Sequence, residues 1–144
     1  MRREEILGTW TLVSFEGINL ETSAKRYPLG PDAVGLIMYT EDGYMSAQIM
    51  RPDRPRYTVP DVAGGGTQEE AAAAAHGYLA YSGPFSVDES GGVIHHEVTV
   101  SLVPDWVGAV ELRDAVLENG HMILSAEQKL PGRTERATLV WQRP

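Results

Sequence analysis

The chain has 144 residues, with 12 basic and 20 acidic side chains and a formal net charge of −8. A chain of this length supports one hydrophobic core and is short for two ordinary domains, so we expect a single domain over residues 1–144. The acidic balance argues against nucleic acids and anionic membrane surfaces as partners, because both attract basic patches. The lack of cysteine excludes disulfides and thiolate chemistry.

The first ten residues, MRREEILGTW, carry charges and lack the apolar segment of a secretory signal. No stretch of the sequence approaches the length of a membrane-spanning helix. From these two features we expect a cytoplasmic protein.

The first half of the chain alternates apolar and polar residues in a way that predicts strands. Residues 7–16, LGTWTLVSFE, read as a strand that places Trp10 on one face and Phe15 on the other. After a long loop, residues 35–40 and 44–50 flank an Asp-Gly turn and predict a hairpin.

A short helix is predicted between this hairpin and the next strand. Residues 51–60 hold three prolines and cannot continue a ladder. Thr67 followed by Glu70 has the character of a capping box, and five alanines follow. We therefore expect a helix around residues 68–76, ended by Gly77.

Two adjacent histidines lie in the β-branched run of residues 91–113, which we interpret as a hairpin with Trp106 in its turn. Successive side chains of a strand point to opposite faces, so His95 and His96 look in opposite directions. His96 belongs to an apolar row and His95 to a polar row. On the second strand, Arg113 shares a face with Glu111.

The remaining strands predicted are residues 78–87, 109–117, 122–127 and 137–142. The total is eight strands with one helical insertion, which makes the protein all-β. Many short strands joined by short turns suggest a closed antiparallel barrel or a sandwich.

Five blocks follow one another in the order of a known family: LGTWTLVS, GLIMYTEDGYMSAQIMRPDRP, YLAYSGPFSVDE, VIHHEVTVSLVPDWVG with Arg113, and LVWQR. In these blocks the chain resembles the bacterial and fungal lipocalin-like domain family. The resemblance implies an eight-stranded antiparallel up-and-down calycin-type barrel with a cavity for a small apolar or amphipathic molecule. It also implies that Trp10 packs across the closed end and that Arg143 lies over its indole ring.

The histidines admit several interpretations. A buried His96 is either a core histidine hydrogen-bonded to a neighbour or, like His95, a catalytic acid/base or a ligand-orienting donor. With no cysteine and only four histidines, the sequence gives little support to a metal site or a cofactor.

The other candidate ligand contacts are side chains whose chemical groups suit a small organic molecule. An inward Arg113 would anchor an anion or a carbonyl group, with Glu97 as one candidate partner, whereas an outward one would be a surface residue. Further candidates provide adaptable apolar surface and polar tips. They are Tyr39, Met45, Tyr81 and Trp106.

Two functions follow from these features. The leading hypothesis is the binding of a small hydrophobic or amphipathic molecule in the barrel cavity. The alternative is a cofactor-independent cyclase or isomerase that uses a cavity histidine as acid/base. A third class of function is an interaction module, in which Trp106 and the arginine-rich loop would form a subunit contact. A homodimer is therefore a further expectation to test.

Overall fold

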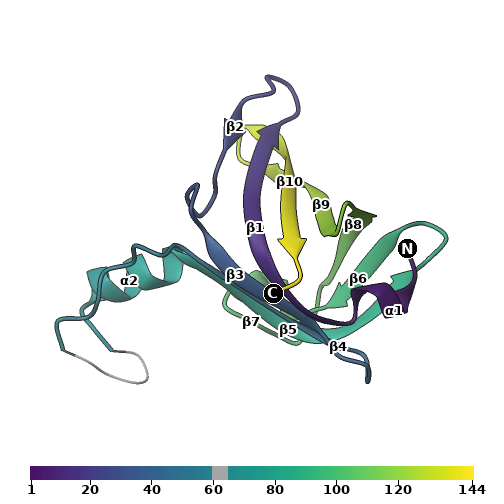
Figure 1. Cartoon of the computed structure of the whole chain (residues 1–144). Coiled ribbons are helices and arrows are strands. Elements are labelled where there is room, and N and C mark those ends of the chain that lie inside the picture. Colours follow the sequence, from purple (N-terminus) through teal and green to yellow (C-terminus); the bar gives the residue numbers. More distant parts are fainter. Residues whose placement is uncertain (60–64) are drawn as a thin grey trace.

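The fold is an antiparallel barrel, seen in the computed structural model of Figure 1, which describes residues 1–59 and 65–144. The strands within these residues are β1 (Gly8–Asn19), β2 (Lys25–Arg26), β3 (Val34–Tyr39), β4 (Tyr44–Met50), β5 (Tyr78–Asp88), β6 (Val93–Glu97), β7 (Val100–Ser101), β8 (Val110–Glu118), β9 (His121–Leu130) and β10 (Arg133–Gln142). The helical elements are α1 (Arg3–Ile6), α2 (Gln68–His76) and the 3₁₀ turn η1 (Pro104–Trp106).

Eight strands form the barrel wall, in the order β1, β3, β4, β5, β6, β8, β9 and β10. Neighbours in this order are antiparallel, and β10 pairs with β1 to close the sheet. The two short strands lie beside the wall, with β2 on β1 and β7 on β5. The predicted eight-stranded up-and-down barrel with one short helix is therefore confirmed. Closure removes the free edges that would otherwise invite aggregation.

Strand β1 corrects one prediction about which side chains face inward. Trp10 and Phe15 are both buried, although simple alternation places them on opposite faces. The register of β1 against β10 shifts between Leu12 and Ser14, which marks a β-bulge or irregularity. One extra residue reverses the faces of everything that follows it. Because of this bulge, the rings of both Trp10 and Phe15 point inward from β1.

The strand that carries the two histidines ends earlier than the sequence suggests. β6 stops at Glu97, and the chain then crosses so that β7 pairs with β5 instead of β8. The crossing brings the Glu97 carbonyl oxygen against Gly83, where any Cβ would collide with it. Glycine is the residue that permits so close a backbone approach. The predicted hairpin of residues 91–113 is therefore an interrupted one, with η1 in its connection.

One end of the barrel is closed by α1 and by Trp10. The indole Nε1 donates to the carbonyl oxygen of Ile6 at 2.8 Å. The Arg143 guanidinium lies 3.8 Å from the centroid of the Trp10 ring and donates to the carbonyl oxygens of Glu5 and Thr9. The arginine-over-indole contact implied by the family resemblance is confirmed.

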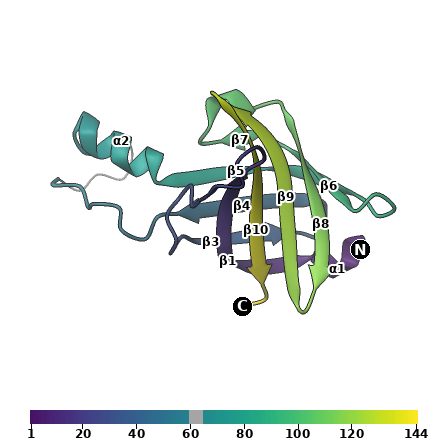
Figure 2. The ribbon, with the colours of Figure 1, turned by 90° about the horizontal axis from the view of Figure 1, so that it is seen from above.

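Helix α2 extends away from the barrel, as Figures 1 and 2 show. Its bounds and its Thr67 capping box agree with the prediction, and it buries none of its residues. Pro60, the last residue of the predicted proline-rich loop, lies outside the described residues together with residues 61–64. No helix in the described parts of the chain is long and apolar enough to span a membrane.

Candidate functional site

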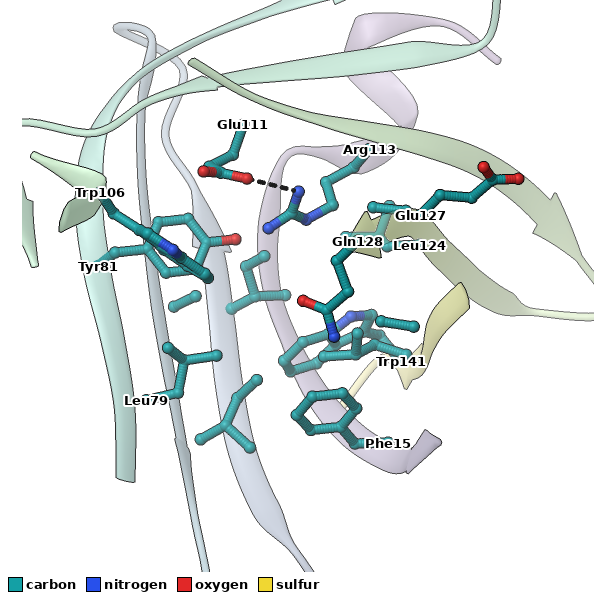
Figure 3. Close-up of a pocket in the computed structure, with 16 residues that line it drawn as sticks. Phe15, Leu79, Tyr81, Trp106, Glu111, Arg113, Leu124, Glu127, Gln128 and Trp141 are labelled. Carbon is teal, nitrogen blue, oxygen red and sulfur yellow. Dashed lines mark hydrogen bonds and ion pairs between the residues drawn. The ribbon is translucent and has the colours of Figure 1, made fainter. Parts of the chain in front are cut away.

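A cavity of about 160 Å³ lies inside the barrel (Figure 3). Its wall is built by side chains from most of the barrel strands and from η1. The lining residues are Phe15, Ile37, Ala47, Ile49, Leu79, Tyr81, Trp106, Glu111, Arg113, Leu124, Ala126, Glu127, Gln128, Ala137, Leu139 and Trp141. A cavity of roughly 150 Å³ accepts a benzene molecule, so this one has room for an aromatic ring.

The greater part of the wall is apolar. Aliphatic side chains of β3, β4, β5, β9 and β10 surround the space, and the rings of Phe15 and Trp141 lie on one side of it (Figure 3). Two small residues, Ala126 of β9 and Ala137 of β10, are cross-strand partners in the same wall. Large side chains at these two positions would occupy the space, so the alanines help to create the cavity.

A polar group occupies the opposite side of the cavity in Figure 3. Arg113 Nη1 forms an ion pair with Glu111 Oε2 at 3.3 Å and donates to the carbonyl oxygen of Leu112 at 2.9 Å. The Arg113 guanidinium also lies 6.0 Å from the centroid of the Trp106 ring, and Trp106 packs edge-on against Tyr81 at 5.2 Å. The guanidinium is thus held by a carboxylate and an aromatic ring while it faces the cavity.

His96 is fully buried and contacts Tyr81, one of the cavity residues. Its Nδ1 lies 3.0 Å from the Tyr81 hydroxyl oxygen, and its Nε2 lies 2.8 Å from the Tyr39 hydroxyl oxygen. Burial, with the nearby charges of Arg113 and His95, lowers the pKa of His96 from 6.5 to about 3. The imidazole is therefore neutral at pH 7 and links two tyrosines.

The pKa values of both tyrosine hydroxyls are raised above the ordinary value of 10, chiefly by burial. The positive charge of the neighbouring Arg113 guanidinium acts in the opposite direction on the pKa of Tyr81, because it favours the phenolate. Both tyrosines are thus neutral hydroxyl groups at neutral pH.

The structure brings most of the predicted site residues together, although some line the cavity and others lie in the core beside it. Tyr81, Trp106 and Arg113 line the cavity. Tyr39, Met45 and His96 are buried in the core, and two of these, Tyr39 and His96, join the cavity through Tyr81. His95, the remaining candidate, is partly exposed and, by strand alternation, points away from the barrel interior. A catalytic role for either histidine stays a prediction.

The partner of Arg113 differs from the one suggested by the sequence. Glu97 is exposed at the end of β6, and Glu111, two residues from Arg113 on β8, forms the ion pair. Residues i and i+2 of a strand share a face, so the alternation of β8 could have identified this pair.

Sequence reasoning missed the contributions of β9 and β10. Gln128 reaches the cavity and donates to the buried carboxylate of Glu135 at 3.2 Å. Trp141 lines the cavity, and its Nε1 is a buried donor with no hydrogen-bond partner in the part of the chain that the structure describes. Along both strands every second side chain points into the barrel, and this alternation could have identified these residues.

The described residues contain no group of three or more His, Cys, Asp or Glu side chains placed to hold a metal ion. The cavity instead offers donors and acceptors for an organic molecule: a hydroxyl, a guanidinium, a carboxylate and an amide beside apolar walls. A few polar groups among apolar ones are typical of small-molecule sites, where they orient the ligand.

Comparison with known proteins agrees with this arrangement. The model of a family described as the lipocalin-like domain matches residues 7–144. A protein of Aspergillus oryzae, named as a 4'-hydroxy-3'-methoxypropiophenone carrier protein, is 35% identical over an alignment of 107 residues that covers 69% of this chain and 96% of the relative. The barrel, its cavity and the carrier relative confirm the prediction of a protein that binds a small molecule. By its sequence match over nearly the whole chain and by its closed barrel, the chain belongs to the lipocalin-like domain family.

Proposed function

We propose that the protein is a carrier for a molecule with one aromatic ring and polar oxygen substituents, such as a substituted phenyl ketone. The observation that carries this proposal is the cavity of about 160 Å³, whose apolar wall is bounded on one side by Tyr81, Glu111 and Arg113. The volume matches a single ring, since a benzene molecule is held by a void of roughly 150 Å³. The polar side gives oxygen substituents a place to form hydrogen bonds.

The name of the Aspergillus oryzae relative supports the same ligand class. That protein is named as the carrier of a propiophenone with a hydroxyl and a methoxy group on its ring. Such a molecule has an aromatic ring, for which the cavity has room, and three oxygen-bearing groups, for which its polar side offers hydrogen-bonding partners. The name of the relative and the cavity of this chain therefore support the same ligand class independently.

The proposal is tested by titrating the protein with 4'-hydroxy-3'-methoxypropiophenone in a calorimeter and following tryptophan fluorescence in parallel. Trp106 and Trp141 line the cavity, so a bound ring changes their emission. We expect saturable binding to the wild-type protein with a stoichiometry of one.

The matched variants are Ala126→Phe, which fills the cavity, and Ala72→Phe, which adds the same bulk on the exposed surface of α2. Ala126→Phe should weaken binding at least about tenfold, because ring and side chain cannot share the space. Ala72→Phe should bind as the wild type does. Absence of binding to the wild type, or equal binding by both variants, would contradict the proposal.

A further inference from the structure

The hydrogen-bond chain that links Tyr39, His96 and Tyr81 has a direction that its surroundings determine. The two tyrosine hydroxyls each offer one hydrogen, and a neutral imidazole offers one more and accepts one. His96 is neutral and contacts one hydroxyl through each ring nitrogen. Only two arrangements of the hydrogens satisfy both contacts, and they differ in where the spare hydroxyl hydrogen lies.

In the first arrangement, Tyr39 donates to His96 Nε2, and Nδ1–H donates to the Tyr81 oxygen. The hydrogen of Tyr81 is then left over, and Tyr81 lines the cavity. A ligand or a water molecule can accept it there.

In the second arrangement every donation runs the other way, and the hydrogen of Tyr39 is left over. Tyr39 is buried in the core and does not line the cavity. Among the described residues, His96 Nε2 is the one hydrogen-bond partner of its hydroxyl. A buried donor without an acceptor is penalised, so the first arrangement is favoured by roughly fivefold to somewhat over a hundredfold.

We infer that Tyr39 and His96 fix Tyr81 as a hydrogen-bond donor to the ligand, so that the cavity selects molecules with an acceptor oxygen, such as a ketone carbonyl, at this position. The inference about the ligand rests on the proposed function, since it assumes that a molecule occupies the cavity. The inference about direction rests on the protein alone. Tyr39 and His96 are positioning residues in this scheme, because they act on the ligand through Tyr81.

The direction of the chain is measured by the tautomer of His96. Protein labelled with ¹⁵N in the histidine rings gives two-bond ¹H–¹⁵N correlations that distinguish a protonated from an unprotonated ring nitrogen at pH 7. Four histidines contribute signals, and His76→Gln, His95→Gln and His121→Gln assign His96 by elimination without disturbing the core. We expect hydrogen on Nδ1 and none on Nε2. Hydrogen on Nε2 would overturn the inference.

The donor role of Tyr81 is measured with two probes, propiophenone and propylbenzene, which differ by a carbonyl in place of a methylene. Tyr81→Phe removes the hydroxyl, and Tyr44→Phe, at an exposed tyrosine, is the matched control. We expect Tyr81→Phe to weaken propiophenone about tenfold and propylbenzene less than about twofold, because one hydrogen bond is worth about that factor. Tyr44→Phe should change neither affinity.

The outcomes separate the inference from the proposed function. Equal weakening of both probes by Tyr81→Phe, or of neither, would overturn the donor role while leaving the cavity as a binding site. Failure of the wild type to bind either probe would contradict the proposed function, and the tautomer of His96 would then decide the direction of the chain by itself.

Discussion

His96 makes the stability of the protein depend on pH, because its imidazole is buried in a neutral form. Its pKa falls from 6.5 to about 3 on folding. Between these values the unfolded chain binds a proton that the folded chain does not, so the free energy of unfolding decreases as pH falls from 6.5 toward 3. Above pH 6.5 both states are neutral and the effect is absent.

We expect the wild-type protein to lose about 2 kcal/mol of unfolding free energy between pH 7.5 and pH 5 from this residue alone. Urea unfolding at a series of pH values measures the loss. In His96→Gln the slope of stability against pH should be flatter, whatever the absolute stability of the variant, and His121→Gln should keep the wild-type slope. A slope that is unchanged in His96→Gln would show that other groups cause the acid sensitivity.

Alternation along a strand predicted the face of the sheet correctly for some side chains and wrongly for others. Glu111 and Arg113 share a face of β8, as the sequence indicates, and both line the cavity because β8 runs without interruption through these positions. Trp10 and Phe15 were assigned to opposite faces, and both are buried because β1 contains a register shift. Nothing in the sequence LGTWTLVSFE marks that shift, since a bulge depends on how β10 pairs with it.

Helix α2 is only weakly coupled to the barrel. It buries no residue, and its start is held by the capping box in which Glu70 N donates to Thr67 Oγ1 and Thr67 N donates to Glu70 Oε1. Glu70 also accepts from the backbone N and the hydroxyl of Thr58, which ties the preceding loop to the helix. Local contacts therefore hold this element.

Thr67→Ala should destabilise α2 by about 1 kcal/mol, because it removes the acceptor of the cap. Since local openings exchange amide hydrogens independently of global unfolding, the α2 amides should exchange about fivefold faster. The barrel amides in the same spectrum provide the control and should keep their rates. A fall in the midpoint of global unfolding would contradict this, because it would show that α2 supports the barrel.

The helix and the turns were predictable because their signals are local. The Thr67 cap, the alanine run and Gly77 lie within eleven consecutive positions, and each acts on its immediate neighbours. The end of β6 was not predictable in this way. It depends on Gly83 of another strand, where the absence of a side chain lets the Glu97 carbonyl approach.

For the whole molecule, the number and order of the strands in the barrel wall followed from the sequence, whereas the position of the cavity did not. Ala126 and Ala137 look unremarkable in isolation, and they leave room only because β9 and β10 pair them across the wall. The same holds for the buried link between Tyr39 and His96, which are 57 positions apart in the chain. Such contacts arise from closure of the barrel, which no local pattern encodes.

The closed end of the barrel should contribute stability without taking part in binding. Arg143 stacks on Trp10 and donates to the carbonyl oxygens of Glu5 and Thr9, so it joins α1, β1 and the end of the chain. None of these four residues lines the cavity. The stacking and the hydrogen bonds each contribute about 1 kcal/mol in comparable settings, so we expect Arg143→Ala to lower the unfolding free energy by about 1–3 kcal/mol.

Urea unfolding measures this loss, with Arg56→Ala at an exposed position of the loop as the matched control, which should change stability by less than about 0.5 kcal/mol. Calorimetric titration with propiophenone should give the same affinity for Arg143→Ala and the wild type at a temperature where both are folded. A weaker affinity in Arg143→Ala would show that the closed end transmits strain to the cavity. Unchanged stability would show that α1 and Trp10 close the barrel without the arginine.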